Sequence, residues 1–185
     1  GTDALFDKFI EQDVPYPPVV DVNRVNVCEG YAPAENPNLL DDVAWAFNDK
    51  IYESLQNFWM AVSDYNRDID NDLDDFMPHA TIFNSKKVKV MYEAYIKDEK
   101  SLWGYEKLLT PDTFDGESED DGLYYAEIMA ECEAYEDHFG AIELLQWIHN
   151  SLASKELGDH IFFEGFSIEG YEEDGTPVIS LHLGS

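Results

Sequence analysis

The side chains in this sequence that are most able to bind a partner or take part in chemistry are its carboxylates. The 185 residues include 40 Asp and Glu but only 11 Lys and Arg, which gives a formal net charge of −29. Between Lys107 and Lys155 there is no Lys or Arg, while twelve acidic residues lie in that interval. These carboxylates have no basic neighbour in the sequence, so they are the first candidates for a binding surface.

The densest acidic region runs from residue 115 into an expected helix that contains Glu127 and Glu131. Residues four apart on a helix lie about 5–6 Å apart at Cβ, which is comparable with the spacing of phosphates along a DNA strand. Such a surface could imitate nucleic-acid phosphate, whereas the alternative is a solvated acidic face that only maintains solubility. The predicted partner-binding residues are Asp115, Glu117, Glu119, Asp120, Asp121, Glu127 and Glu131.

A second acidic stretch, residues 64–75, has part of the pattern of a calcium-binding loop. An EF-hand loop needs Gly at its sixth position and a bidentate Glu at its twelfth, but Ile69 and Asp75 stand there. We therefore interpret the stretch as a solvated acidic connection. Calcium binding stays as an alternative, through Asp64, Asn66, Asp68, Asp72 and Asp75.

Motifs for catalysis are missing from the sequence. None of the five histidines belongs to an HExxH or Glu-x-x-His pattern, and we expect all five to be structural. There is no GxSxG, GxGxxG or Walker loop. Cys132 lies between Glu131 and Glu133, which disfavour a thiolate, and Cys28 has no identifiable base. We predict no catalytic residues, no metal site and no cofactor, and hence no enzyme.

The charge also limits the partners and the location. Nucleic acids and anionic membranes attract basic surfaces, so this chain should bind neither directly. No apolar run approaches the ~18 residues of a membrane helix, and the two cysteines form no CxxC pair. We expect a cytoplasmic protein with reduced thiols whose electrostatic partner is a basic protein.

The spacing of apolar residues predicts the elements that must position these side chains. Aromatic residues make up 14% of the chain, enough for a packed core despite the charge. We expect one domain over residues 1–185, with an extended arm at 12–37 that contains a strand near 20–27. Asp174-Gly175 between two β-rich runs predicts an antiparallel C-terminal hairpin. The predicted helices cover residues 39–63, 85–96, 125–139 and 141–152, with shorter ones at 3–11 and 103–109.

The expected fold is therefore α+β, mainly helical, with about four helices and a small antiparallel sheet. The expected function is that of an acidic protein that occludes a basic partner, either as an immunity protein for a nuclease toxin or as a DNA mimic against a defence protein. The alternatives are an enzyme or calcium-binding protein with a site assembled from distant residues, or a structural subunit. The lysines between Lys86 and Lys107 matter here, because folding back onto the acidic surface would cancel part of its charge.

Overall fold

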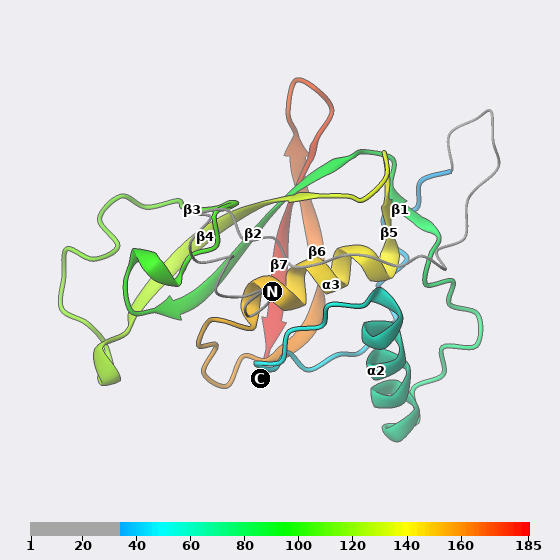
Figure 1. The fold of residues 1–185 in the computed structure, drawn as a ribbon, viewed down its shortest axis with the longest axis horizontal. Coiled ribbons are helices and arrows are strands. Elements are labelled where there is room, and N and C mark those ends of the chain that lie inside the picture. Colours follow the sequence, from blue (N-terminus) through cyan, green and yellow to red (C-terminus); the bar gives the residue numbers. More distant parts are fainter. Residues whose placement is uncertain (1–33) are drawn as a thin grey trace.

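The computed structural model describes residues 34–185, and in them one helix packs against a five-stranded sheet (Figure 1). A second helix and irregular chain cover the other side of that helix. The elements are α2 (Leu55–Asp68), β1 (Thr81–Phe83), β2 (Lys87–Ile96), β3 (Glu106–Leu108), β4 (Tyr124–Glu133), β5 (Phe139–Gly140), α3 (Ala141–Leu152), β6 (Phe162–Tyr171) and β7 (Pro177–Gly184), with short 3-10 turns at Glu99–Ser101 and Asp120–Gly122.

The main sheet has the strand order β3-β4-β2-β7-β6, and β1 pairs with β5 in a separate small sheet. Neighbouring strands of the main sheet are antiparallel except β2 and β7, which are parallel. The β2–β4 ladder extends over the whole of both strands, whereas β7 pairs with β2 only at residues 89–91. Figure 1 shows β6 and β7 running across the direction of β2 and β4.

Two of the predicted helices, 85–96 and 125–139, are wrong, because Lys87–Ile96 and Tyr124–Glu133 form the strands β2 and β4. In β2, every second residue from Val88 to Ile96 is buried, which is the period of a strand with one face on the core. The outer face of β2 also carries Met91 and Tyr95. Together with the buried residues they fill the three-and-four spacing of a helix, so the sequence pattern was ambiguous.

The predicted helix over 39–63 is only half correct, since the chain is helical at Leu55–Asp68 and irregular before it. The backbone groups of the irregular part form hydrogen bonds with side chains of α3 instead of hydrogen bonds within a helix. The Tyr52 amide donates to Asn150 Oδ1 at 2.9 Å, and Gln146 Nε2 donates to the Tyr52 carbonyl at 2.9 Å. The Ser54 hydroxyl then caps α2 by accepting from the Asn57 amide at 3.1 Å.

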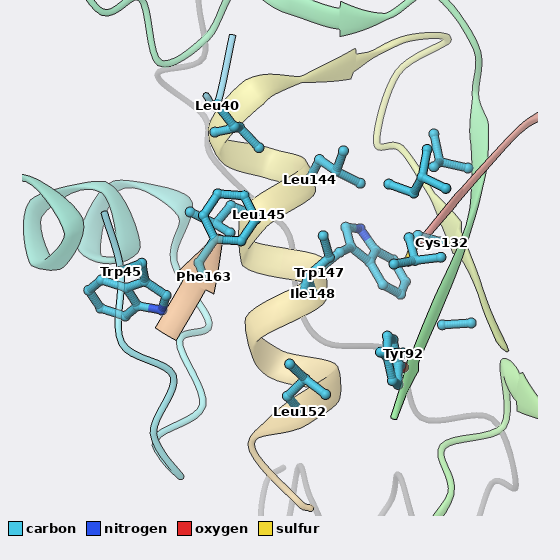
Figure 2. Close-up of a cluster of buried hydrophobic side chains, with 14 of the residues drawn as sticks. Leu40, Trp45, Tyr92, Cys132, Leu144, Leu145, Trp147, Ile148, Leu152 and Phe163 are labelled. Carbon is cyan, nitrogen blue, oxygen red and sulfur yellow. The ribbon is translucent and has the colours of Figure 1, made fainter. Parts of the chain in front are cut away.

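Helix α3, predicted over 141–152, is confirmed and forms the centre of the core. All twelve of its residues are buried, so both sides of the helix are covered. Figure 2 shows Trp147 directed toward Tyr92 and Cys132 of the sheet, with Trp45 on the opposite side of the helix. A helix with buried residues on every side, either apolar or with hydrogen-bonded polar groups, is expected only in a protein interior.

The expectation of a mainly helical fold is wrong: within residues 34–185 there are two α-helices and seven strands, a sheet-rich α+β arrangement. The predicted helix at 103–109 is replaced by an irregular segment and β3. The C-terminal hairpin is confirmed as β6 and β7. The predicted helix at 3–11, the strand near 20–27 and most of the arm at 12–37 lie outside the described residues. No helix in the described part is long and apolar enough to span a membrane.

Candidate cation-binding groove

The predicted partner-binding residues do not form one cluster. Asp115, Glu117, Glu119 and Asp121 are exposed in the loop between β3 and β4, and Asp120 lies in the same loop. Figure 1 shows this loop projecting past the end of the sheet. Glu127 and Glu131 are on the outer face of strand β4, not on a helix, and four residues along a strand span about 13 Å. The close helical spacing that suggested phosphate mimicry at these two residues is therefore absent.

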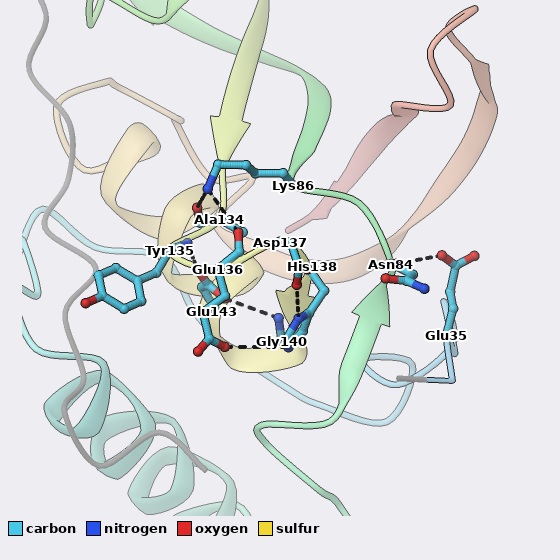
Figure 3. Close-up of polar contacts among 10 residues, drawn as sticks. All are labelled: Glu35, Asn84, Lys86, Ala134, Tyr135, Glu136, Asp137, His138, Gly140 and Glu143. Carbon is cyan, nitrogen blue, oxygen red and sulfur yellow. Dashed lines mark hydrogen bonds and ion pairs between the residues drawn. The ribbon is translucent and has the colours of Figure 1, made fainter. Parts of the chain in front are cut away.

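One end of the outer sheet face is neutralised by lysines. Lys87 Nζ lies 3.3 Å from Glu131, Lys86 Nζ 3.9 Å from Glu133, and Lys89 Nζ 3.7 Å from Glu172. The Lys86 ammonium also donates to the carbonyl groups that follow β4, at residues 134 and 136 (Figure 3). Three lysines of the 86–107 segment therefore fold back onto the acidic surface, and Glu131 is no longer an unpaired carboxylate.

The other end of the same face carries glutamates that form no ion pair with a lysine within residues 34–185. Glu93 and Glu127 lie directly opposite each other in the β2–β4 ladder. Together with Glu164 and Glu169 of β6 they line a groove of about 490 Å³. None of the described residues that line it is Lys or Arg, and within residues 34–185 none of the four carboxylates forms an ion pair with Lys or Arg. Like charges placed opposite each other destabilise a sheet, so this arrangement costs stability rather than adding it.

Two β-bulges bring the β6 glutamates to this groove. Phe163 pairs with Leu183 and Phe166 with Leu181, so Glu164 and Gly165 together face a single residue of β7. A second irregularity falls between Ile168 and Gly170, where Glu169 is the extra residue. Bulges redirect side chains and also protect the edge of a sheet from other strands. Here both bulges have the further result that a carboxylate lines the same groove as Glu93 and Glu127.

The Glu164 carboxylate lies close to the backbone of Gly184. A Cβ atom at Gly184 would lie 1.9 Å from Glu164 Oε2, so only glycine leaves room for the carboxylate in its present place. The neighbouring Ser167 hydroxyl and His182 Nε2 are 2.6 Å apart at the groove. The position of Glu164 therefore depends on Gly184 as well as on the bulge in β6.

The groove continues into a smaller cavity where β2 and β7 separate. The parallel ladder ends at Met91, and farther along β2 the Tyr95 amide donates to the Glu156 carbonyl at 2.8 Å. A cavity of about 170 Å³ lies in this region and shares Glu93, Leu181 and Leu183 with the groove. Its wall includes Tyr95 and Tyr125, whose ring centroids are 5.8 Å apart. The crevice beyond diverging carboxyl ends of parallel strands is a frequent ligand site in open sheets.

The Tyr125 phenol is held against the acidic part of the groove. Burial raises the pKa of Tyr125, and the Glu93 carboxylate, which accepts its hydrogen bond, raises it further. The phenol therefore stays protonated at neutral pH and acts as a donor toward Glu93. Tyr125 is 45% exposed, so an apolar ligand group could still cover it.

The sequence analysis missed a buried ion pair on the inner side of the sheet. Lys155 Nζ lies 2.9 Å from Glu106 Oε1, and both side chains are inaccessible to solvent. The Tyr92 hydroxyl donates to the other Glu106 oxygen, and the Trp103 amide donates to Oε1 at 2.7 Å. Burial lowers the pKa of Lys155, while the Glu106 carboxylate opposes that shift. One signal was present in the sequence, since Lys155 is the only Lys or Arg after Lys107.

The remaining candidates for catalysis are packed in the interior. Trp45 Nε1 donates to His149 Nδ1 at 3.1 Å, so the imidazole proton is on Nε2, which donates to the Lys50 carbonyl at 2.7 Å. Burial lowers the pKa of His149 to about 4. Cys132 is fully buried, and burial raises the pKa of its thiol, which makes it a poor nucleophile.

The alternative calcium residues are not arranged as a loop. Asp64 and Asp68 lie on α2, and the buried Asn66 carboxamide binds the Ala44 backbone, accepting from its amide at 3.0 Å and donating to its carbonyl at 2.8 Å. Asp72 and Asp75 are exposed in the following turn. In the described part of the chain no group of three or more His, Cys, Asp or Glu side chains could hold a metal ion. A cleft of about 400 Å³ does lie beside this region, lined in part by Trp59, Asp70, Asp72 and Asp74.

Comparisons with protein-family models, with curated proteins and with solved structures give no match for this chain. The groove itself is the strongest indication of function, because it joins four carboxylates that have no Lys or Arg ion pair within residues 34–185 to an aromatic cavity on an open sheet face.

Proposed function

We propose that this protein binds and occludes a basic partner protein, and that the groove between β2, β4, β6 and β7 is its contact surface. The observation that supports this most is the convergence of Glu93, Glu127, Glu164 and Glu169 on one groove with no Lys or Arg among its described lining residues. The arrangement contains a repulsive cross-strand pair and depends on two bulges in β6. A bound ammonium or guanidinium group would turn that repulsion into attraction.

The partner class follows from the same electrostatics. A nuclease toxin or a nucleic-acid-binding defence protein must present a positive surface to hold phosphate, and an acidic groove that covers this surface would exclude the nucleic acid. Association would be fast and would weaken steeply with salt. The acidic loop 115–121 lies outside the lining of the groove and would add long-range attraction rather than contacts.

We propose binding rather than catalysis, because the ionisable and nucleophilic groups of the interior are either paired with each other or buried away from solvent. Glu106 and Lys155 are paired, and Cys132 is buried with a raised thiol pKa. The two cysteines continue to favour a reducing compartment, so we also propose a cytoplasmic location.

The proposal can be tested by affinity capture from host lysate, with elution by a salt gradient and identification by mass spectrometry. The groove variant combines Glu93→Gln, Glu127→Gln, Glu164→Gln and Glu169→Gln. The matched control removes the same charge beside α2, through Asp70→Asn, Asp72→Asn, Asp74→Asn and Asp75→Asn. Thermal unfolding of each variant checks that the fold is retained.

We expect the unchanged protein and the control to retain one basic protein that salt or DNA releases, and the groove variant to lose it. If the partner is a nuclease, the unchanged protein should also inhibit its cleavage of DNA. Retention of the same partner by the groove variant at full strength would contradict the proposed surface. Loss of the partner in the control alone would move the site to the cleft beside α2.

A further inference from the structure

The groove is not uniformly acidic, and its two parts are arranged in strand register. Glu93 pairs with Glu127 in the β2–β4 ladder, and Tyr95 pairs with Tyr125 two residues farther along β2. All four side chains are on the outer face, because residues two apart on a strand point the same way. The acidic pair and the aromatic pair are therefore separated by roughly 7 Å along the strand.

The two parts also belong to one continuous depression. The cavity beside the tyrosines shares Glu93, Leu181 and Leu183 with the acidic groove. The apolar side of the cavity comes from the separated ends of β2 and β7, where Leu181 and Leu183 are only half-buried. A ligand that neutralised only the carboxylates would leave this apolar surface in water.

We infer that the groove selects an extended basic segment of a partner protein in which a Lys or Arg is followed, two residues later, by an apolar side chain. This inference rests on the proposed function and names the chemistry that the groove recognises. In an extended segment, side chains at i and i+2 lie on one face and are roughly 7 Å apart. That spacing matches the distance from the Glu93–Glu127 pair to the Tyr95–Tyr125 pair.

Each contact then has a physical role. The cationic group lies among the four carboxylates, which compensates their mutual repulsion. The apolar group covers the exposed Tyr125 ring and removes apolar surface from water. The Tyr125 ring packs edge-on against Tyr95, with centroids 5.8 Å apart, which restricts the ring at the boundary between the two parts and limits the entropy lost on binding.

Two peptides of identical composition and charge test the spacing directly. One contains two copies of Gly-Lys-Ser-Leu-Gly, with the apolar residue at i+2, and the other contains two copies of Gly-Lys-Leu-Ser-Gly, with the apolar residue at i+1. Both are titrated into the ¹⁵N-labelled full chain, with amide shifts as the readout, because this method also detects weak binding.

We expect the i+2 peptide to bind about tenfold more tightly, the ratio that partial burial of one leucine would give. The shifted amides should include residues 93, 95, 125 and 127. Tyr125→Ala should remove the preference but keep salt-sensitive binding, whereas Tyr125→Phe should keep the preference. Tyr135→Ala, at a tyrosine that is 65% exposed outside the groove, is the matched control and should change nothing.

The outcomes separate the two proposals. Equal affinity for both peptides, abolished by the four glutamate substitutions in the groove, would overturn the spacing rule and leave the acidic binding function intact. Tighter binding of the i+1 peptide would also overturn the rule. Failure of both peptides to bind at low salt would overturn the rule and the proposed function together.

Discussion

The two faces of the main sheet hold carboxylates in opposite ways. On the inner face, Glu106 is inaccessible to solvent and is bound by Lys155, by the Tyr92 hydroxyl and by the Trp103 amide. On the outer face, Glu93 and Glu127 oppose each other across a ladder and line a groove that has no Lys or Arg among its described lining residues. A buried charge must be neutralised at its site, whereas water screens an exposed one. The outer carboxylates are consequently the ones that remain available to a partner.

The largest expected effect comes from breaking the inner pair. Lys155→Met leaves the Glu106 carboxylate buried without its cation, and we expect the free energy of unfolding to fall by roughly 3–5 kcal/mol. Urea unfolding of the purified chain measures this loss. The double variant Glu106→Gln with Lys155→Met should lose less than Lys155→Met alone, because no charge is left buried. A loss below about 1 kcal/mol in Lys155→Met would show that the inner face tolerates a lone charge.

A second test measures whether protonation of a buried histidine destabilises the fold. The pKa of His149 is lowered from 6.5 to about 4 in the folded protein, so the unfolded chain binds a proton first as the pH falls. The contribution of the neutral His149 imidazole to the free energy of unfolding is therefore fully present above pH 6.5. It is lost between pH 6.5 and about 4, by roughly 3 kcal/mol in total. His149→Gln can still accept from Trp45 and has no such titration.

The difference in unfolding free energy between wild type and His149→Gln isolates this contribution from the many carboxylates that titrate in the same range. We expect the difference to change by most of that amount between pH 7 and pH 4, in favour of the variant at low pH. A difference that stays constant with pH would mean that the imidazole accepts its proton inside the core.

The outer face should respond in the opposite direction. Glu127→Gln removes the repulsion with Glu93 and should raise the free energy of unfolding by about 0.5 kcal/mol at low ionic strength. The gain should shrink as salt is added, because the screening length shortens. Glu131→Gln, which removes the partner of Lys87, should give no gain. Thermal unfolding at two salt concentrations measures both, and a stability loss in Glu127→Gln would contradict the comparison.

The sequence predicted parts of this fold where one interpretation of the pattern dominated. The buried helix at 141–152 and the hairpin around Asp174-Gly175 were predictable because their periodicity and turn residues agree. Strand β2 was not, since Met91 and Tyr95 on its outer face supply the additional apolar positions of a helix. The segment before α2 was not predictable either, because its backbone forms hydrogen bonds with α3 side chains that are distant in the sequence.

The candidate site was predictable only in part, for similar reasons. Glu127 belongs to the groove, but Glu131 is neutralised by a lysine whose position depends on a strand pairing that the sequence pattern hid. Glu164 and Glu169 reach the groove through bulges, which shift side chains without leaving a periodic signal. The glycines at 165 and 170, in a run that otherwise has strand character, were the local indications of the two bulges.

The smallest expected effect is also the most specific to the geometry of the outer face. Gly184→Ala adds a Cβ where the Glu164 carboxylate lies, so that carboxylate must move while the net charge stays the same. Because the displaced atoms are at the end of a flexible side chain, the fold should be retained and partner binding should weaken by only about twofold. Gly170→Ala is the matched control, because nothing lies within 4 Å of the added atom. Titration of the captured partner, or of the peptide with i+2 spacing, compares the two variants. If Gly184→Ala and Gly170→Ala bind alike, the groove attracts through total charge, and the placement of Glu164 by the bulge contributes nothing to recognition.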